Sequence, residues 1–140
     1  MFDRIIVAHD GSDGAQKAFD AALQLAVHFE VDLHMVSVEE DLPRFAQTVE
    51  EVRGEKEMAD EYFKPLAAQC RRRAALKGRT LHPSIIARHG VKAIVEFVRE
   101  GGFDLLVVGY TGHSKIYDQI WGGTSQNLAR LAPCSILVVK

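Results

Sequence analysis

The sequence predicts one α/β domain built on a doubly wound sheet of five parallel strands, with helices on both faces. Short apolar runs alternate with helical segments along the whole chain, and its 140 residues fit a single domain. The alternation reads βαβαβαβαβ. This order is typical of parallel sheets, because each connection between parallel strands has to cross a face of the sheet.

The first 38 residues read as strand, helix and strand. A β-branched run at 5–8 is closed by an Asp-Gly-Ser turn. Apolar residues then recur at spacings of three and four over 15–29, which predicts one buried face of an amphipathic helix. Ser12 or Asp13 can cap its first N–H groups. Residues 33–38 supply the second strand, so we expect a parallel pair with a right-handed crossover.

The middle of the chain is the least regular part. Residues 40–60 are acidic and contain a proline and a glycine, so we expect a loop that enters a helix. That helix should run from about Tyr62 to a stop at Gly78, with Pro65 in its first turn or at a kink. The three arginines at 71–73 are expected to form a solvated face of the helix.

The second half repeats the alternation. We expect a third strand at 83–88 and a helix whose apolar face lies within 91–98. The continuous apolar run at 105–108 is typical of a central strand covered on both faces. A helix at about 124–131 and a fifth strand at 136–139 complete the pattern.

Composition limits the function classes. The net charge of -2 gives no electrostatic footprint for nucleic acid or an anionic membrane. No apolar run approaches the roughly 20 residues of a membrane span, and the start lacks a secretory signal pattern. Cys70 and Cys134 lack CxxC spacing, so we expect free thiols in a reducing compartment and a cytoplasmic protein.

The candidate chemistry follows the fourth strand, where ligands bind in doubly wound sheets. This segment contains the glycines Gly109, Gly112, Gly122 and Gly123. Glycines allow a backbone to approach a ligand, and the N–H groups at a helix start favour an anion such as phosphate. Thr124 or Ser125 can cap that helix and donate a hydroxyl. The alternative is that the glycines serve only tight turns and that Thr124 is only a cap.

The spacing in GYTGHSKIYDQIWGG, G-x2-G-x9-G, is similar to the pattern by which nucleotide-binding universal stress proteins are recognised. The opening RIIVAHDGS resembles that family's first-strand motif, LHMVSV its second strand and LAPCSILVV its closing strand. The similarity extends from Met1 to Lys140. It implies a Rossmann-like fold of the adenine nucleotide alpha hydrolase type, a single domain over 1–140, and a homodimer that pairs through 135–140.

The resemblance also implies the residues of a nucleotide site: Asp10, Val38, Gly109, Gly112, Gly122, Gly123 and Thr124, with Ser125 beside them. Asp10 matches the acidic residue beside the adenosine, and Val38 matches the position that faces the adenine. The first two glycines match those that let the ribose and phosphates lie close, and the stretch 122–124 matches the phosphate-binding N–H groups. Two alternatives stay open: Asp10 can simply order the Asp-Gly-Ser turn, and Val38 can be plain core.

One position departs from the family's pattern. Ser or Thr usually follows the last glycine of the motif, and here Gly123 stands there. The backbone donor is kept but a hydroxyl is lost, and a hydrogen bond to a charged group contributes about 1.5–3 kcal/mol, or roughly ten- to 150-fold in affinity. Thr124, one residue later, carries a hydroxyl that can take its place.

We therefore expect a regulatory module in stress response that binds ATP, or AMP or ADP, with at most slow ATP hydrolysis. Asp10 can help to place Mg²⁺ near the phosphates. No nucleophile–base pair or metal-ligand motif is recognisable, so no catalytic residue is predicted. Two alternatives remain: a dimeric interaction protein of the same fold without nucleotide binding, and an ATP-dependent enzyme. The sequence identifies no protein partner.

Overall fold

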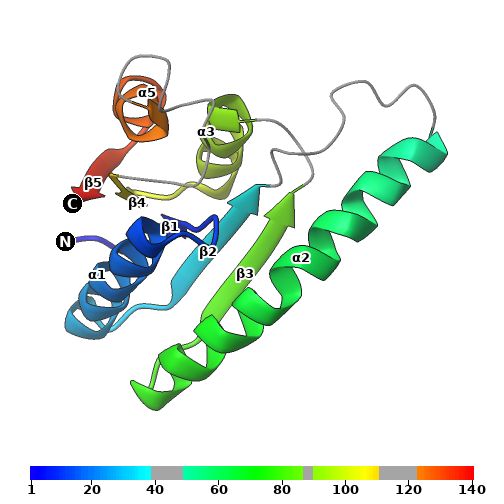
Figure 1. The fold of residues 1–140 in the computed structure, drawn as a ribbon. Coiled ribbons are helices and arrows are strands. Elements are labelled where there is room, and N and C mark those ends of the chain that lie inside the picture. The colour runs from blue at the N-terminus through cyan, green and yellow to red at the C-terminus, as the bar shows by residue number, and fades with distance from the viewer. Residues whose placement is uncertain (39–48, 87–89, 111–122) are drawn as a thin grey trace.

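A computed structural model describes residues 1–38, 49–86, 90–110 and 123–140 of the chain (Figure 1). The strands are β1 (Ile5–Ala8), β2 (Leu33–Val38), β3 (Leu81–Ile86), β4 (Leu105–Gly109) and β5 (Ser135–Val139). The helices are α1 (Asp13–Phe29), α2 (Val49–Leu76), α3 (Gly90–Gly101) and α5 (Gly123–Leu131).

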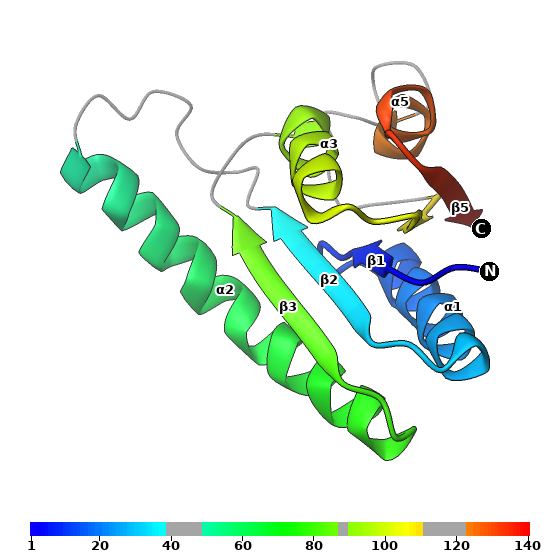
Figure 2. The same ribbon diagram turned by 180° about the vertical axis from the view of Figure 1, so that it is seen from behind.

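The five strands form one parallel sheet in the order β3-β2-β1-β4-β5. Helices α1 and α2 cover one face, and α3 and α5 cover the other (Figures 1 and 2). The predicted doubly wound α/β fold is therefore confirmed. None of the helices in the described ranges combines the length and apolarity needed to cross a membrane.

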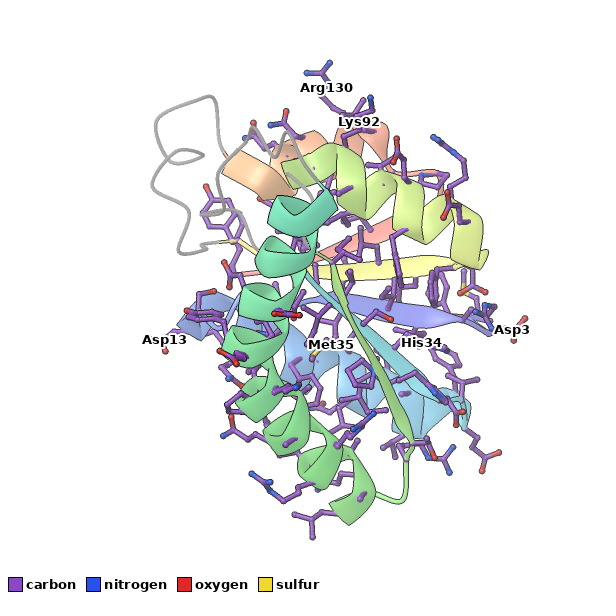
Figure 3. All side chains as sticks on the ribbon, turned by 90° about the vertical axis from the view of Figure 1, so that its right-hand side faces the viewer. Asp3, Asp13, His34, Met35, Lys92 and Arg130 are labelled. Carbon is purple, nitrogen blue, oxygen red and sulfur yellow. The ribbon has the colours of Figure 1, made fainter. Side chains whose placement is uncertain are left out.

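Two hydrophobic cores fill the spaces between the sheet and the helix layers. Met35 of β2, labelled in Figure 3, belongs to the core beneath α1 and α2. Ile5 and Val7 of β1 face α1 and α2, whereas Ile6 between them faces α3. The run at 105–108 divides in the same way between the two cores. Because alternate side chains of both central strands are buried on opposite faces, these strands read as continuous apolar runs.

Helix α1 has well-defined ends. Ser12 is the N-cap, and its Oγ accepts a hydrogen bond from the Ala15 N–H at 3.1 Å. At the other end Glu30 has a left-handed backbone with φ of 59°, and its N–H and that of Val31 bond back to carbonyls of the last turn. Glycine is the usual residue at such a position, so Glu30 carries conformational strain.

Two predicted boundaries are wrong. Helix α2 begins at Val49 rather than near Tyr62, so most of the expected loop at 40–60 is helical. Its first half, residues 49–62, contains five glutamates, and these helix-forming residues outweigh one glycine. Consequently Pro65 lies well inside the helix, so its placement in the first turn is wrong, and the alternative of a kink stays a prediction. Strand β3 begins at Leu81, two residues earlier than expected.

The prediction of a solvated arginine face is wrong at one position. Arg71 and Arg72 are exposed, but the Arg73 guanidinium lies 4.8 Å above the Phe19 ring of α1. It also donates a hydrogen bond of 3.1 Å to Gln16 Oε1 and forms an ion pair with Asp20. Arg73 therefore links α2 to α1 by three contacts.

Candidate functional site

The candidate site lies at the carboxyl edge of the sheet, where the strand order reverses. From β1 the chain proceeds to β2 on one side, and from β4 it proceeds to β5 on the other. Neighbouring β1 and β4 therefore leave a crevice beyond their carboxyl ends, because their connections diverge. Asp10 follows β1 and Gly109 ends β4, so both predicted residues lie at this switch point.

The Asp-Gly-Ser turn after β1 is held by its own side chains. The carboxylate of half-buried Asp10 accepts a hydrogen bond from the Ser12 N–H at 2.9 Å through Oδ1. Gly11 between them has φ of +88°, a conformation that favours glycine. Asp10 thus orders the turn that presents the capped start of α1, which is the structural alternative raised from the sequence.

His9, which no sequence motif singled out, is buried beneath this turn with only 2% of its surface exposed. Its Nδ1 accepts a hydrogen bond of 3.0 Å from the Gly11 N–H, so the neutral ring carries its proton on Nε2. Burial lowers the His9 pKa, and Arg73 adds to this shift while Asp10 and Gln16 oppose it. Nε2 has no hydrogen-bond partner in the described part of the chain.

The backbone of His9 also ties the end of β1 to β2. The His9 N–H donates to the Val36 carbonyl at 3.0 Å, and the buried Ser37 hydroxyl donates to the His9 carbonyl at 2.8 Å. These contacts fix the direction in which the chain leaves the sheet. A polar residue at position 37 inside an apolar strand is the sequence signal for this link.

Gly109 has a packing role at the end of β4. A Cβ atom at this position would lie 2.6 Å from the carbonyl carbon and oxygen of Gly14, and 3.0 Å from the Ala15 nitrogen. The first turn of α1 therefore approaches β4 more closely than any side chain allows. Glycine is therefore required at position 109 by the close packing of α1 against β4, whether or not a ligand also lies close to it.

Val38 ends β2 beside Ile86 of β3. It is 8% exposed and belongs to the core beneath α3. Its side chain is thus core, the alternative that the sequence left open, while its position still marks the same edge as Asp10.

The predicted phosphate-binding stretch is described only in part. Gly112 and Gly122 lie outside the described residues. Gly123 is the first residue of α5, so the first turn of this helix contains Thr124 and Ser125. The side chain of Ser125 is buried at 4% exposure. The N–H groups of the first turn of a helix have no partner inside the helix, and they favour an anion.

The described residues thus provide two elements that suit an adenine nucleotide: a half-buried carboxylate at Asp10 and a helix start at Gly123. A carboxylate accepts hydrogen bonds from ribose hydroxyls, and a helix start attracts phosphate. No group of three or more potential metal-ligating side chains occurs among the described residues.

The model of the universal stress protein family matches residues 1–140. The chain is 29% identical to universal stress protein YxiE of Bacillus subtilis, with all of both chains covered. Its fold is similar to that of universal stress protein UspA from Lactobacillus plantarum, with a TM-score of 0.84, 23% identity, and coverage of 99% and 98% of the two chains. A universal stress protein solved in complex with cAMP matches with a TM-score of 0.74 and 26% identity over 99% of this chain and 97% of that chain.

Proposed function

The chain belongs to the universal stress protein family, and on that premise we propose that it is a regulatory module that binds an adenine nucleotide at the carboxyl edge of its sheet. The ligand is ATP or a related adenosine phosphate, and the bound state changes what the protein contacts in a stress response. The solved relative in complex with cAMP supports the ligand class. Hydrolysis, if the module performs it, is slow.

The observation that carries this proposal is the half-buried Asp10 at the β1–β4 switch point. Its Oδ1 is already oriented by the Ser12 N–H, so the carboxylate is fixed before a ligand arrives. A preorganised acceptor loses little side-chain entropy on binding. We assign it the ribose hydroxyls, while the N–H groups of the Gly123 helix start receive the phosphates.

Mg²⁺ fits the same arrangement as a companion of the phosphates. This ion prefers oxygen ligands, usually takes one or two from protein carboxylates, and fills its other positions with phosphate oxygens and water. Because the Asp10 carboxylate is assigned to the ribose hydroxyls, it would hold the ion through water. When bound, the ion would neutralise phosphate charge.

Isothermal titration of the nucleotide-stripped protein with ATP and Mg²⁺ tests the proposal. We expect saturable binding in the micromolar range. Asp10→Asn keeps an oxygen for the Ser12 N–H but removes the charge, so the variant should fold and bind about tenfold more weakly. Asp13→Asn is the matched control, because Asp13 projects outward from the start of α1 (Figure 3).

Unchanged affinity in Asp10→Asn would remove Asp10 from the site. A Gly112→Val variant that still folds should also lose binding, since its side chain would obstruct the motif's first loop. Equal loss in Asp10→Asn and Asp13→Asn would indicate a general electrostatic effect rather than a site.

A second function is favoured by Gly123, which stands at the start of α5 where the family usually has a hydroxyl. Under this alternative the chain is an interaction protein that no longer binds nucleotide. Gly123→Ser distinguishes the two. An increase of roughly tenfold or more in ATP affinity supports nucleotide binding, whereas no detectable binding of millimolar ATP by either form favours the interaction protein. An ATP-dependent enzyme would instead release ADP or pyrophosphate with a specific co-substrate.

We also propose a homodimer that pairs through β5, one of the two edge strands. The Val139 carbonyl accepts a hydrogen bond from the Tyr110 N–H. Because the direction alternates along a strand, residues 135, 137 and 139 direct their N–H and C=O groups toward β4. Ile136 and Val138 then direct theirs outward, and Leu137 is 37% exposed. An apolar edge with free N–H and C=O groups is a template for pairing.

The opposite edge is less suited to pairing. The Leu33 N–H bonds to the Thr80 carbonyl, so the backbone of Pro83 in β3 is directed outward by the same alternation. Proline has no N–H, and it protects an edge strand. Val138→Pro should reproduce this protection at β5 without breaking the β4 ladder. We expect a dimer by light scattering and a monomer for this variant; a monomeric parent protein would exclude the dimer.

A further inference from the structure

Helices α1 and α2 are set apart over β2, which leaves a groove between them. α1 packs mainly over β1 and β4 and α2 over β3, whereas α3 and α5 contact each other on the other face. The resulting cavity has a volume of about 640 Å³. This lies within the range of small-molecule sites, which is about 300–1,000 Å³. We call it the α1–α2 groove.

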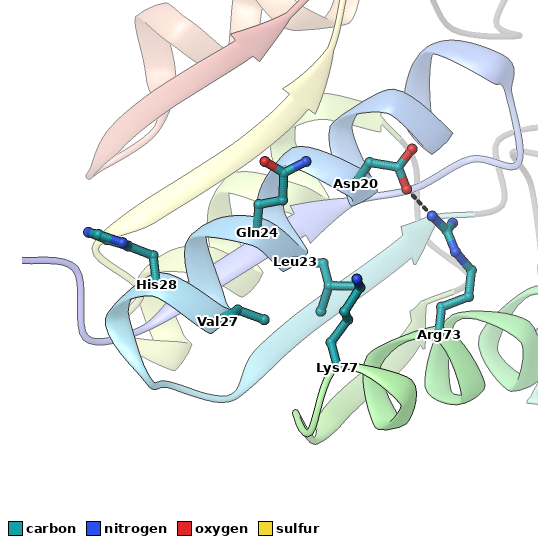
Figure 4. A pocket seen from close by; sticks show the side chains of 7 residues that line it. All are labelled: Asp20, Leu23, Gln24, Val27, His28, Arg73 and Lys77. Atoms are coloured by element: carbon teal, nitrogen blue, oxygen red, sulfur yellow. Dashed lines mark hydrogen bonds and ion pairs between the residues drawn. The ribbon is translucent and has the colours of Figure 1, made fainter.

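The groove has an apolar floor. Leu23 is buried at 6% exposure, and Val27, one turn further along α1, is 40% exposed. Both side chains extend from α1 toward α2 (Figure 4). An exposed valine beside a buried leucine offers apolar surface that a ligand can cover.

The charges on the groove are unequal. At one end Asp20 is neutralised by Arg73, which also holds Gln16. Directly after the last residue of α2, the exposed Lys77 side chain extends toward Leu23 (Figure 4). No acidic group among the described residues pairs with Lys77. The groove therefore has one cation available to a ligand, directly above its apolar floor.

Polar donors lie on the rim of α1. Gln24 and His28 line the cavity from the same helix, one turn apart. Both side chains extend away from Lys77 (Figure 4), so Lys77 alone supplies the contact with an anion. The combination of an apolar floor and one unpaired ammonium group is complementary to an amphiphilic anion.

The length of the groove selects the size of the ligand. Its lining extends from Asp20 to His28 on α1, a rise of about 12 Å. A docked amphipathic helix stable enough to bind would be longer, at about 18 Å or more for 12 residues. A medium-length carboxylate matches the groove better than a peptide helix does.

We propose that the α1–α2 groove is a second ligand site, separate from the carboxyl edge, for small amphiphilic carboxylates. The carboxylate lies on Lys77 and the apolar chain covers Leu23 and Val27. Leu23 is eleven residues beyond Ser12 on α1, or about 16 Å along the helix. The two sites are far enough apart to be occupied together.

The test is a titration of the full-length, isotope-labelled protein with sodium decanoate, followed by amide chemical shifts. We expect saturable shifts in α1 around 23–28 and in the last turn of α2. Lys77→Gln should weaken binding about three- to tenfold, because the contact is charged but partly solvated. Lys92→Gln is the matched control, since Lys92 is an exposed lysine on α3 across the sheet (Figure 3).

Two further measurements keep the proposal open to refutation. Val27→Ser should weaken decanoate binding while leaving ATP binding unchanged, and decanol should bind more weakly than decanoate. The proposal is overturned if Lys77→Gln and Lys92→Gln bind decanoate equally well, if decanol binds as tightly, or if the saturable shifts lie outside the groove. Failure of ATP binding does not affect this outcome, because the readout is local to α1 and α2.

Discussion

Replacing Gly109 by alanine tests how closely α1 is fitted to the end of β4. The new Cβ would lie 2.6 Å from backbone atoms of Gly14, about 0.8 Å inside the 3.4 Å at which ordinary contact begins. Backbone atoms of a capped helix turn cannot rotate away as a flexible side chain can, so the helix has to shift. Overpacking of this kind costs about 1–3 kcal/mol, and a backbone clash lies toward the upper end.

We therefore expect Gly109→Ala to lower the free energy of unfolding by about 2–3 kcal/mol. For 140 residues the unfolding entropy is about 0.29 kcal/mol/K, so Tm should fall by about 7–10 °C. Urea unfolding followed by circular dichroism measures the first quantity and a thermal melt the second. ATP affinity should fall as well, because the shifted turn carries Asp10.

Gly78→Ala is the control for glycine substitution as such. Gly78 has φ of +71°, and a Cβ atom added to it would meet no atom within 4 Å, so the cost of this substitution is conformational, about 1 kcal/mol. A Gly109→Ala loss no larger than that of Gly78→Ala would refute the steric reasoning. It would mean that α1 can move away from β4 at little cost.

Three other predictions follow from named contacts. Arg73→Met should lower the free energy of unfolding by about 0.5–1 kcal/mol, because both side chains of the ion pair are partly solvated. A double-mutant cycle with Asp20→Asn should give a coupling energy of at most that size. A coupling energy of zero would contradict the ion pair. Burial is the main cause that lowers the pKa values of His9 and of His34 on β2 below the ordinary 6.5. As the pH falls below about 6.5, the unfolded chain therefore binds more protons than the folded protein does. The free energy of unfolding should therefore rise as pH increases toward about 6.5 and then level off, which urea unfolding midpoints measured at several pH values would report. His34→Gln should reduce part of this slope. An unchanged slope would exclude His34 as a source of the pH dependence. Glu30→Gly should raise the free energy of unfolding by about 0.5–1 kcal/mol in the same assay, because glycine adopts φ of 59° without strain; a loss of stability would show that the Glu30 side chain contributes more than the strain costs.

Local signals in the sequence predicted most of the fold. The runs at 5–8 and 33–38 match β1 and β2 to the residue. β-branched runs bounded by turn residues have few alternatives, since both faces are buried in a parallel sheet. The start of α2 was missed because its first half is polar, without the apolar periodicity that marks a packed helix.

The candidate site could be predicted in position but only partly in detail. Asp10 and Gly109 lie at the switch point because strand order brings the ends of β1 and β4 together. The hydrogen bond from Gly11 to His9 was not foreseen, since burial of a histidine depends on what packs above it. The role of Gly109 in helix packing was also hidden, because its partner lies about a hundred residues earlier.

The family, the alternation of strands and helices, and the edge at which polar and glycine residues gather were all predictable from the chain alone. These features depend on residues within a few positions of one another, so they can be recognised directly from the sequence. The contacts of Arg73 with Phe19 and Asp20, and the separation of α1 from α2 beside an unpaired Lys77, are visible only in the folded protein. Such contacts depend on how two helices are spaced over the sheet, and that spacing is set by the packing of the whole layer.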